Sequence, residues 1–145
     1  MTIFEAISKI NEIKPNAYPQ GLKIWWLHTL DSMVKSKVID THEDDNAVKF
    51  DGYTEDTNLA TQLLIPAPYD EVYLFWLESK IDYSNGETGR YNNSISMFNT
   101  AYAEFERYYN RTHMPKSAKL KFFPTPKTPE YQAANAVAKV SIEED

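Results

Sequence analysis

"RYNNSISMFNTAYAEFERYYNRTHMP", residues Arg90 to Pro115, is the stretch of this sequence that decides the fold. Its apolar and aromatic residues recur at intervals of four and three residues, in the order Tyr91, Ile95, Phe98, Tyr102, Phe105 and Tyr109. Residues at this spacing lie on one face of an α-helix. The pattern therefore predicts a long helix that buries this seam of side chains and is ended by Pro115.

Two further helices are predicted in the first part of the chain. Thr2 and Glu5 have the spacing of a capping box, and isoleucines at helical intervals follow them. This helix should stop near Lys14, because Pro15 disfavours helical geometry in the residue before it. The second helix is expected over residues 19–39, with these apolar positions: Leu22, Trp25, Trp26, Leu27, Leu30, Met33, Val34 and Val38.

The second helix contains two adjacent tryptophans. Trp25 and Trp26 are adjacent and point about 100° apart, so one is expected in the core and the other partly exposed. Trp25 is assigned to the core. The polar residues of this helix are expected mostly on its other faces: Lys23, His28, Asp31, Lys35 and Lys37.

A third helix is expected to begin after Pro66 and Pro68. Its segment "VYLFWL", residues 72–77, is apolar on every side, so this helix should be the central and most buried one. Asn85-Gly86 should end it, because glycine readily adopts the left-handed backbone of a helix stop. The candidate core residues of the helices are Trp25, Leu30, Trp76, Tyr91, Ile95, Phe98, Tyr102, Phe105 and Tyr109.

An acidic loop, residues 40–66, separates the second and third helices. Residues 41–58 carry one lysine and six acids, for a sum of −5: Glu43, Asp44, Asp45, Asp51, Glu55 and Asp56. Two short runs in the loop, "AVKF" and "TQLLIP", have strand character. They could pair as a short β-ribbon, or the loop could cross the helices or reach a neighbour in an extended form.

The C-terminal part of the chain has the opposite charge. Residues 107–129 hold six bases and no acid, although the whole chain carries a net charge of −6. We therefore divide the 145 residues into a mainly α-helical domain of about four helices, 1–115, and a basic, proline-rich, extended arm, 116–145. Opposite charges of this kind can steer association.

No catalytic chemistry is predicted. The absence of cysteine excludes disulfides, cysteine-based zinc sites and thiol nucleophiles. The three histidines have no partner at a catalytic spacing, and the four glycines form no phosphate-binding loop. The acids of "DTHEDDNAVKFDG" do not have the spacing of a calcium loop. We expect no enzyme, catalytic residue, cofactor or metal site, and no apolar run has the length of a membrane span.

The basic part of the chain has two interpretations. In "RYYNRTHMPKSAKLKFF", bases alternate with aromatic rings, which is the composition of a surface that stacks on nucleic-acid bases and binds phosphates. The alternative is a basic arm that docks on an acidic patch of another subunit, since the domain itself is acidic.

Three segments together resemble a known family. They are "WWLHTLD" (25–31), "LLIPAPYDEVYLFWLESKIDYSNGE" (63–87) and the stretch from Arg90 to Pro115. As a set they resemble small proteins encoded in the head-gene clusters of long-tailed phages and prophages of Gram-positive bacteria. This family is similar to head–tail connectors, also called adaptors, and the resemblance covers roughly residues 14–115.

The resemblance implies a structural virion protein of the phage neck, assembled in the bacterial cytoplasm. Such a protein forms a ring, typically of twelve copies, beneath the portal protein. The ring extends the DNA channel without sequence-specific DNA contact and docks the next neck or tail-completion protein, away from any membrane. In similar connectors an extended arm or C-terminal element grips the portal.

The candidate contacts with a neighbour or the portal are residues of the predicted long helix that lie outside the seam, together with residues of the basic arm. They are Asn92, Asn93, Asn99, Tyr108, Arg111, Lys116, Lys119, Lys121, Phe122, Phe123 and Lys127. The alternative function is a DNA-contacting packaging or regulatory protein of the same gene cluster. A small soluble hydrolase is the third class considered.

Overall fold

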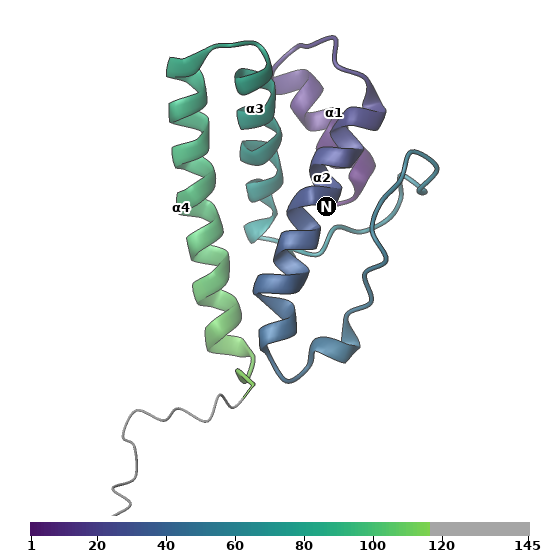
Figure 1. The fold of residues 1–145 in the computed structure, drawn as a ribbon, viewed down its shortest axis with the longest axis vertical. Helices are drawn as coiled ribbons and strands as arrows, with labels where there is room; N and C mark the ends of the chain where they lie inside the picture. The colour runs from purple at the N-terminus through teal and green to yellow at the C-terminus, as the bar shows by residue number, and fades with distance from the viewer. Residues whose placement is uncertain (117–145) are drawn as a thin grey trace, which may run out of the picture.

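The structure is a computed structural model that describes residues 1–116. These residues form a helical bundle, which confirms the predicted mainly α-helical class (Figure 1). Its α-helices are α1 (Ile3–Ile13), α2 (Gln20–Lys37), α3 (Val72–Ser84) and α4 (Thr88–Thr112), and its 3-10 turns are η1 (Ile39–Thr41), η2 (Asp45–Ala47) and η3 (Tyr69–Glu71). The predictions for Lys119, Lys121, Phe122, Phe123 and Lys127 lie outside the described residues.

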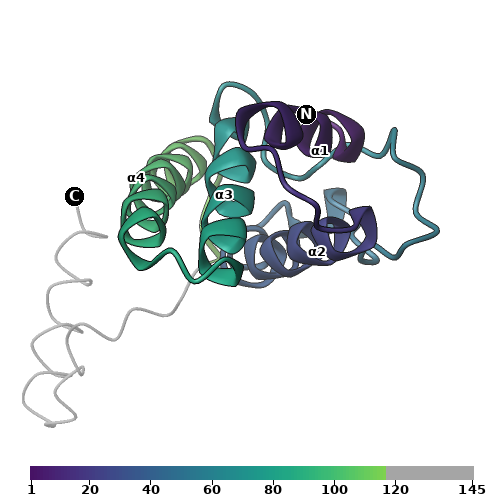
Figure 2. The ribbon, with the colours of Figure 1, turned by 90° about the horizontal axis from the view of Figure 1, so that it is seen from above.

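Helix α3 is central, as its apolar sequence predicts. It lies between α4 on one side and α1 and α2 on the other (Figure 2). Val72, Tyr73, Leu77 and Ile81 of α3 are completely buried. A helix with neighbours on several sides needs apolar residues on several sides, which explains why "VYLFWL" has no polar face.

The seam of α4 faces α3. Phe98, Phe105 and Tyr109 are buried, and Ile95 and Tyr102 are half-buried against them. Tyr91, at the first end of the seam, is half-buried with its ring 5.5 Å from the ring of Tyr83. Of the remaining core candidates, Leu30 is buried, and half-buried Trp76 donates a 2.8 Å hydrogen bond to the Trp26 carbonyl oxygen.

The placement of Trp25 in the core is wrong. The side chain of Trp25 is 57% exposed, whereas that of Trp26 is 5% exposed and packs in the core. The two residues do differ in direction, as adjacent helical residues must. Helical periodicity alone cannot decide between them, because residues on both sides of the pair are apolar.

The helix ends follow the sequence signals closely. Thr2 and Glu5 form both hydrogen bonds of the capping box, at 3.1 and 3.2 Å. Helix α4 ends at Thr112, before Pro115, because the chain there becomes extended and pairs with the η1 segment. In that pairing the backbone N–H of Lys116 donates to the Thr41 carbonyl oxygen at 2.9 Å.

The acidic loop crosses the helices in an extended form. Among residues 1–116 its two strand-like runs do not pair with each other, and only isolated bridges occur. The loop pairs instead with the start of α1: Ile3 N–H donates to the Thr61 carbonyl oxygen and Phe4 N–H to that of Leu59. These N–H groups belong to the first helical turn and have no partner within the helix, so the loop satisfies them.

Two glycines near the α3–α4 turn provide a test of the left-handed stop at the end of α3. Gly86 has a φ of +73°, whereas Gly89 lies in the first turn of α4 with no such angle, and a Cβ would meet no atom at either position. We expect Gly86→Ala to lower the free energy of unfolding by about 1 kcal/mol, because left-handed backbone disfavours a side chain. Gly89→Ala should raise it by up to about 1 kcal/mol. Urea denaturation measures both, and equal effects would contradict the assigned stop.

Candidate interaction surfaces

The first candidate surface lies on α4, which forms one edge of the bundle (Figures 1 and 2). No charged residue occurs between Arg90 and Glu104, although much of this helix faces solvent. The exposed residues in between, which we call the α4 outer face, are Asn92, Asn93, Ser96, Met97, Asn99 and Thr100. Solvent-facing helical surfaces normally carry charges, and depletion of charge is typical of the centre of a protein interface.

The amide groups of the α4 outer face are free to bind a partner. Within residues 1–116, the side chains of Asn92, Asn93 and Asn99 form no hydrogen bond. Met97 adds an apolar side chain that is 48% exposed. The structure therefore brings three of the candidate contacts together on one uncharged face.

The second candidate surface is a groove at the opposite edge of the domain, which we call the Trp25 groove. It has a volume of about 480 Å³ and lies between the first half of α2 and loop residues 53–55. Leu22 and Trp25 line it from the helix, and Tyr53 and Glu55 line it from the loop. Residues Asp51, Glu55 and Asp56 are exposed along the same part of the loop.

A buried carboxylate holds the loop side of the groove in place. Asp31 of α2 is completely buried and accepts hydrogen bonds from the Tyr53 hydroxyl at 2.5 Å, the Tyr73 hydroxyl at 2.6 Å and the Leu64 N–H at 3.2 Å. The Tyr73 oxygen also accepts a 2.7 Å hydrogen bond from the Ile65 N–H. Asp31 therefore joins α2, α3 and two parts of the loop.

The electrostatics of this network follow from its burial. Loss of water raises the pKa of Asp31, and the hydrogen bonds from Tyr53, Tyr73 and Leu64 partly offset that rise. Burial, and then the charge of Asp31, raises the pKa of both tyrosine hydroxyls above their usual range. Tyr53 and Tyr73 therefore keep their protons and remain donors.

His28 supports the same loop from α2. Its Nδ1 accepts a 3.1 Å hydrogen bond from the Tyr53 N–H, and its ring stacks on Phe50. The neighbouring Gly52 has a φ of +87°, and a Cβ there would lie 2.8 Å from the His28 ring. Glycine thus lets the loop turn directly against the histidine.

The third candidate region is the start of the basic arm. Lys116 Nζ forms a 2.5 Å ion pair with Asp45, and the hydrogen bond from this lysine lowers the pKa of the Asp45 carboxyl. Buried His42 donates from Nδ1 to the Val38 carbonyl oxygen at 2.6 Å, and its Nε2 lies 3.0 Å from the Asn110 side chain. Acidic loop and basic arm therefore meet within one chain at this point.

The remaining candidate contacts are less free than the sequence suggests. Tyr108 is half-buried and stacks on Tyr69 with ring centroids 4.6 Å apart, so part of its ring is already covered within the chain. Arg111 is exposed in a shallow hollow that it shares with Tyr69, Glu104 and Arg107. The acids separate into two groups: Glu43, Asp44 and Asp45 near the arm, and Asp51, Glu55 and Asp56 near the groove.

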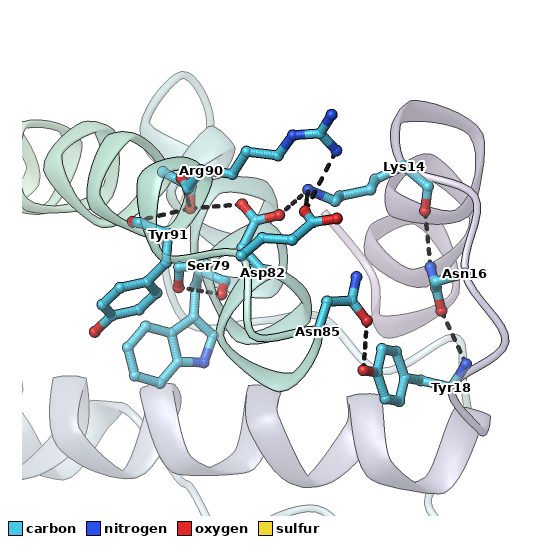
Figure 3. A network of polar contacts seen from close by, with 11 residues as sticks. Lys14, Asn16, Tyr18, Ser79, Asp82, Asn85, Arg90 and Tyr91 are labelled. Carbon is cyan, nitrogen blue, oxygen red and sulfur yellow. Dashed lines mark hydrogen bonds and ion pairs between the residues drawn. The ribbon is translucent and has the colours of Figure 1, made fainter.

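A second buried carboxylate joins the other ends of the helices. Asp82 of α3 is 1% exposed, accepts a 2.9 Å hydrogen bond from the Ser94 hydroxyl and forms an ion pair with Lys14 (Figure 3). Beside it, the Tyr18 hydroxyl donates to Asn85 Oδ1 at 2.6 Å. These contacts attach the α1–α2 connection to the α3–α4 turn.

Removing the positive charge from this network should destabilise the domain. In Lys14→Met, the buried Asp82 carboxylate keeps the Ser94 hydroxyl but loses its ion pair, and we expect the free energy of unfolding to fall by about 2–3 kcal/mol. The double variant Lys14→Met/Asp82→Asn, which has no unpaired charge, should recover about half of that loss. Urea denaturation of the wild type, the single variant and the double variant checks the coupling, and a double variant no more stable than Lys14→Met would contradict it.

Sequence reasoning missed both buried carboxylates and a buried lysine. Asp31, Asp82 and Lys23 are nearly or fully buried, and Lys23 donates a 2.6 Å hydrogen bond to Asn11. The expectation that Lys23 and Asp31 lie on other faces of α2 is therefore wrong. A signal was present, because Asp31 continues the buried series Ile24, Leu27, Val34 and Val38 at intervals of three and four residues.

Two further findings concern chemistry and known proteins. Among residues 1–116, no three histidine or acidic side chains are near enough to hold a metal ion, and no helix there combines the length and apolar character needed to cross a bilayer. Comparison with protein-family models, curated proteins and solved structures finds no match for the chain.

Proposed function

We propose that this chain is a structural subunit of a phage neck, a head–tail connector that assembles head to tail into a ring beneath the portal. The observation that carries the proposal is that one small domain has two unlike surfaces, the α4 outer face and the Trp25 groove. The elements that carry them, α4 and the side formed by α2 and the loop, lie at opposite edges of the bundle (Figures 1 and 2). A contact between two unlike faces repeats from copy to copy and closes into a ring when the rotation permits it.

The chemistry of the two surfaces suits such a contact. The uncharged α4 outer face offers amide groups, and the opposite edge offers the exposed ring of Trp25 and the Tyr53 side of the groove. Tryptophan and tyrosine contribute strongly to interfaces because they combine a large apolar area with a polar group. The Asp31 network keeps the groove ordered before assembly, which lowers the entropic cost of binding.

The neck position and the partners rest on the resemblance of residues 14–115 to connector proteins. It implies the portal protein, a next neck or tail-completion protein and typically twelve copies. A net charge of −6 is compatible with a channel through which DNA slides without being held.

The DNA-contacting alternative has less support from the described residues. The rings of Tyr108 and Tyr109 stack on Tyr69 and His113, so they are not available to stack on bases. Lys116 is paired with Asp45, and Glu104 lies beside Arg107 and Arg111.

The mass of the full-length protein in solution tests the proposal. We expect light scattering to detect oligomers that grow with concentration, or a ring that forms when portal protein is added. A monomer that ignores portal at every concentration would refute the connector. If that monomer also binds DNA with a steep salt dependence, the DNA-contacting alternative is correct instead.

A further inference from the structure

We propose that the Trp25 groove of each copy binds the basic segment 119–127 of the neighbouring copy. The Phe122–Phe123 pair would occupy the groove and the lysines would lie against its acidic rim. This inference rests on the proposed head-to-tail assembly and names the partner of one of its two surfaces.

The groove exposes an aromatic ring of its own, which a bound aromatic side chain could cover. Trp25 is 57% exposed although it lies in a concave surface, while Tyr53 beside it is 7% exposed and fixed by Asp31. Burial of an exposed tryptophan against another ring removes a large apolar area from water and adds a favourable ring contact. The groove therefore favours an occupant with an aromatic anchor.

The rim of the groove requires positive charge in that occupant. Asp51, Glu55 and Asp56 lie within six residues of one another, and none forms an ion pair within residues 1–116. The acids at the other end of the region behave differently, since Asp40 pairs with Lys35 and Asp45 with Lys116. The acids of the loop that have no ion pair among the described residues therefore include the three beside the groove.

The segment "KLKFFPTPK", residues 119–127, supplies both properties. It contains three lysines, two adjacent phenylalanines and no acid. An extended peptide with an aromatic anchor between bases is complementary to an apolar groove with an acidic rim.

Geometry favours the neighbour's segment over the chain's own. Lys116 is fixed beside Thr41, beyond the C-terminal end of α2, whereas Trp25 lies in the second turn of that helix. The helix between them spans roughly 20 Å. Phe122 follows Lys116 by six residues, about 20 Å of fully extended chain, so the chain's own segment would have no slack. The head-to-tail contact proposed above would bring the α4 edge of one copy, with the arm that follows it, against the groove edge of the next copy.

Site-specific photocrosslinking in the full-length protein tests the assignment. A photoreactive phenylalanine replaces Phe122 in ¹⁵N-labelled protein, which is mixed with unlabelled wild type and assembled, with portal if assembly needs it. We expect the crosslinked peptides to contain Trp25 or Tyr53 and to join one labelled with one unlabelled copy. Crosslinks confined to single copies, to other regions or to portal would overturn the proposal.

Charge variants provide an independent readout by sedimentation. Asp51→Asn/Glu55→Gln/Asp56→Asn should weaken assembly about tenfold or more, and Trp25→Ala at least about 30-fold. The matched control Glu43→Gln/Asp44→Asn neutralises exposed acids of the same loop away from the groove and should change assembly less than threefold. Equal effects of the two acid variants would contradict the assigned rim.

The outcomes separate this inference from the function on which it rests. If the protein assembles with its normal mass while the Trp25 and rim variants also assemble normally, the groove assignment fails and the connector remains supported. If the wild type does not assemble with or without portal, both fail.

Discussion

Replacing Asp31 with alanine is expected to lower the free energy of unfolding by about 3–5 kcal/mol, a large part of the roughly 5–15 kcal/mol that stabilises a typical domain. The Tyr53 and Tyr73 hydroxyls and the Leu64 N–H would lose their shared acceptor inside the protein. A buried donor without a partner costs about 1–3 kcal/mol, because it gave up its hydrogen bond to water on folding. Urea denaturation followed by circular dichroism measures the loss.

Two tyrosine variants make the test specific to hydrogen bonding. Tyr73→Phe removes a hydroxyl that donates to Asp31 and accepts from the Ile65 N–H, so two buried groups lose a partner. Tyr53→Phe makes the same chemical change but affects Asp31 alone. We expect losses of about 2–4 kcal/mol for the first and about 1–2 kcal/mol for the second. Equal losses would mean that the network contributes through packing rather than through its hydrogen bonds.

Asp31→Asn serves as the conservative member of the series. Its side-chain oxygen can still accept from Tyr53 and Leu64, so it should lose less stability than Asp31→Ala. An asparagine variant as unstable as the alanine variant would indicate that the negative charge, and not the number of acceptors, is what the site requires.

The α4 seam could be predicted from sequence because every position in it is apolar or aromatic. Phe98 and Phe105 repeat at helical spacing, and packing such an apolar stripe against another helix removes it from water. The equivalent stripe of α2 contains Asp31, and a carboxylate at that position looks like a break in the pattern. Periodicity places Asp31 in the buried series, but the groups that satisfy a buried carboxylate there, Tyr53 and Tyr73, are distant in sequence, so the helix alone does not show that Asp31 is buried.

The course of the acidic loop could be predicted only as one of two alternatives, for a similar reason. The strand character of "TQLLIP" reflects real extended backbone, but its partner is the first turn of α1 rather than "AVKF". The free N–H groups of Ile3 and Phe4 are a general property of helix starts, and nothing local in the sequence states which segment will satisfy them. The Trp25 groove depends on this crossing and was therefore not predicted.

The candidate contacts on α4 show where helical periodicity predicts exposure correctly and where it does not. The seam leaves Asn92, Asn93 and Asn99 outside, and the structure shows these three residues exposed. Tyr108 also lies outside the seam, yet it stacks on Tyr69 of η3, an element that the helical period of α4 cannot reveal. Exposure inferred from one helix therefore holds only where no other element covers it.

Adding one negative charge to the α4 outer face should weaken the proposed assembly strongly without unfolding the protein. Asn99 is exposed in the middle of a helix segment that lacks charge. If this face meets a neighbour, Asn99→Glu buries an unpaired carboxylate in every subunit contact, and a cost of several kcal/mol corresponds to self-association at least about 100-fold weaker. The free energy of unfolding should change by no more than about 0.5 kcal/mol, since the residue is solvent-exposed in the single chain.

Asn99→Gln is the matched control, because glutamine has the size of glutamate and the amide of asparagine. It should weaken assembly only a few-fold, so the ratio between the two variants isolates the effect of charge. Analytical ultracentrifugation of both proteins, with portal protein where the wild type requires it, gives that ratio. If Asn99→Glu assembles like the wild type, the α4 outer face is not part of a subunit contact, and the proposed head-to-tail contact would have to use another surface.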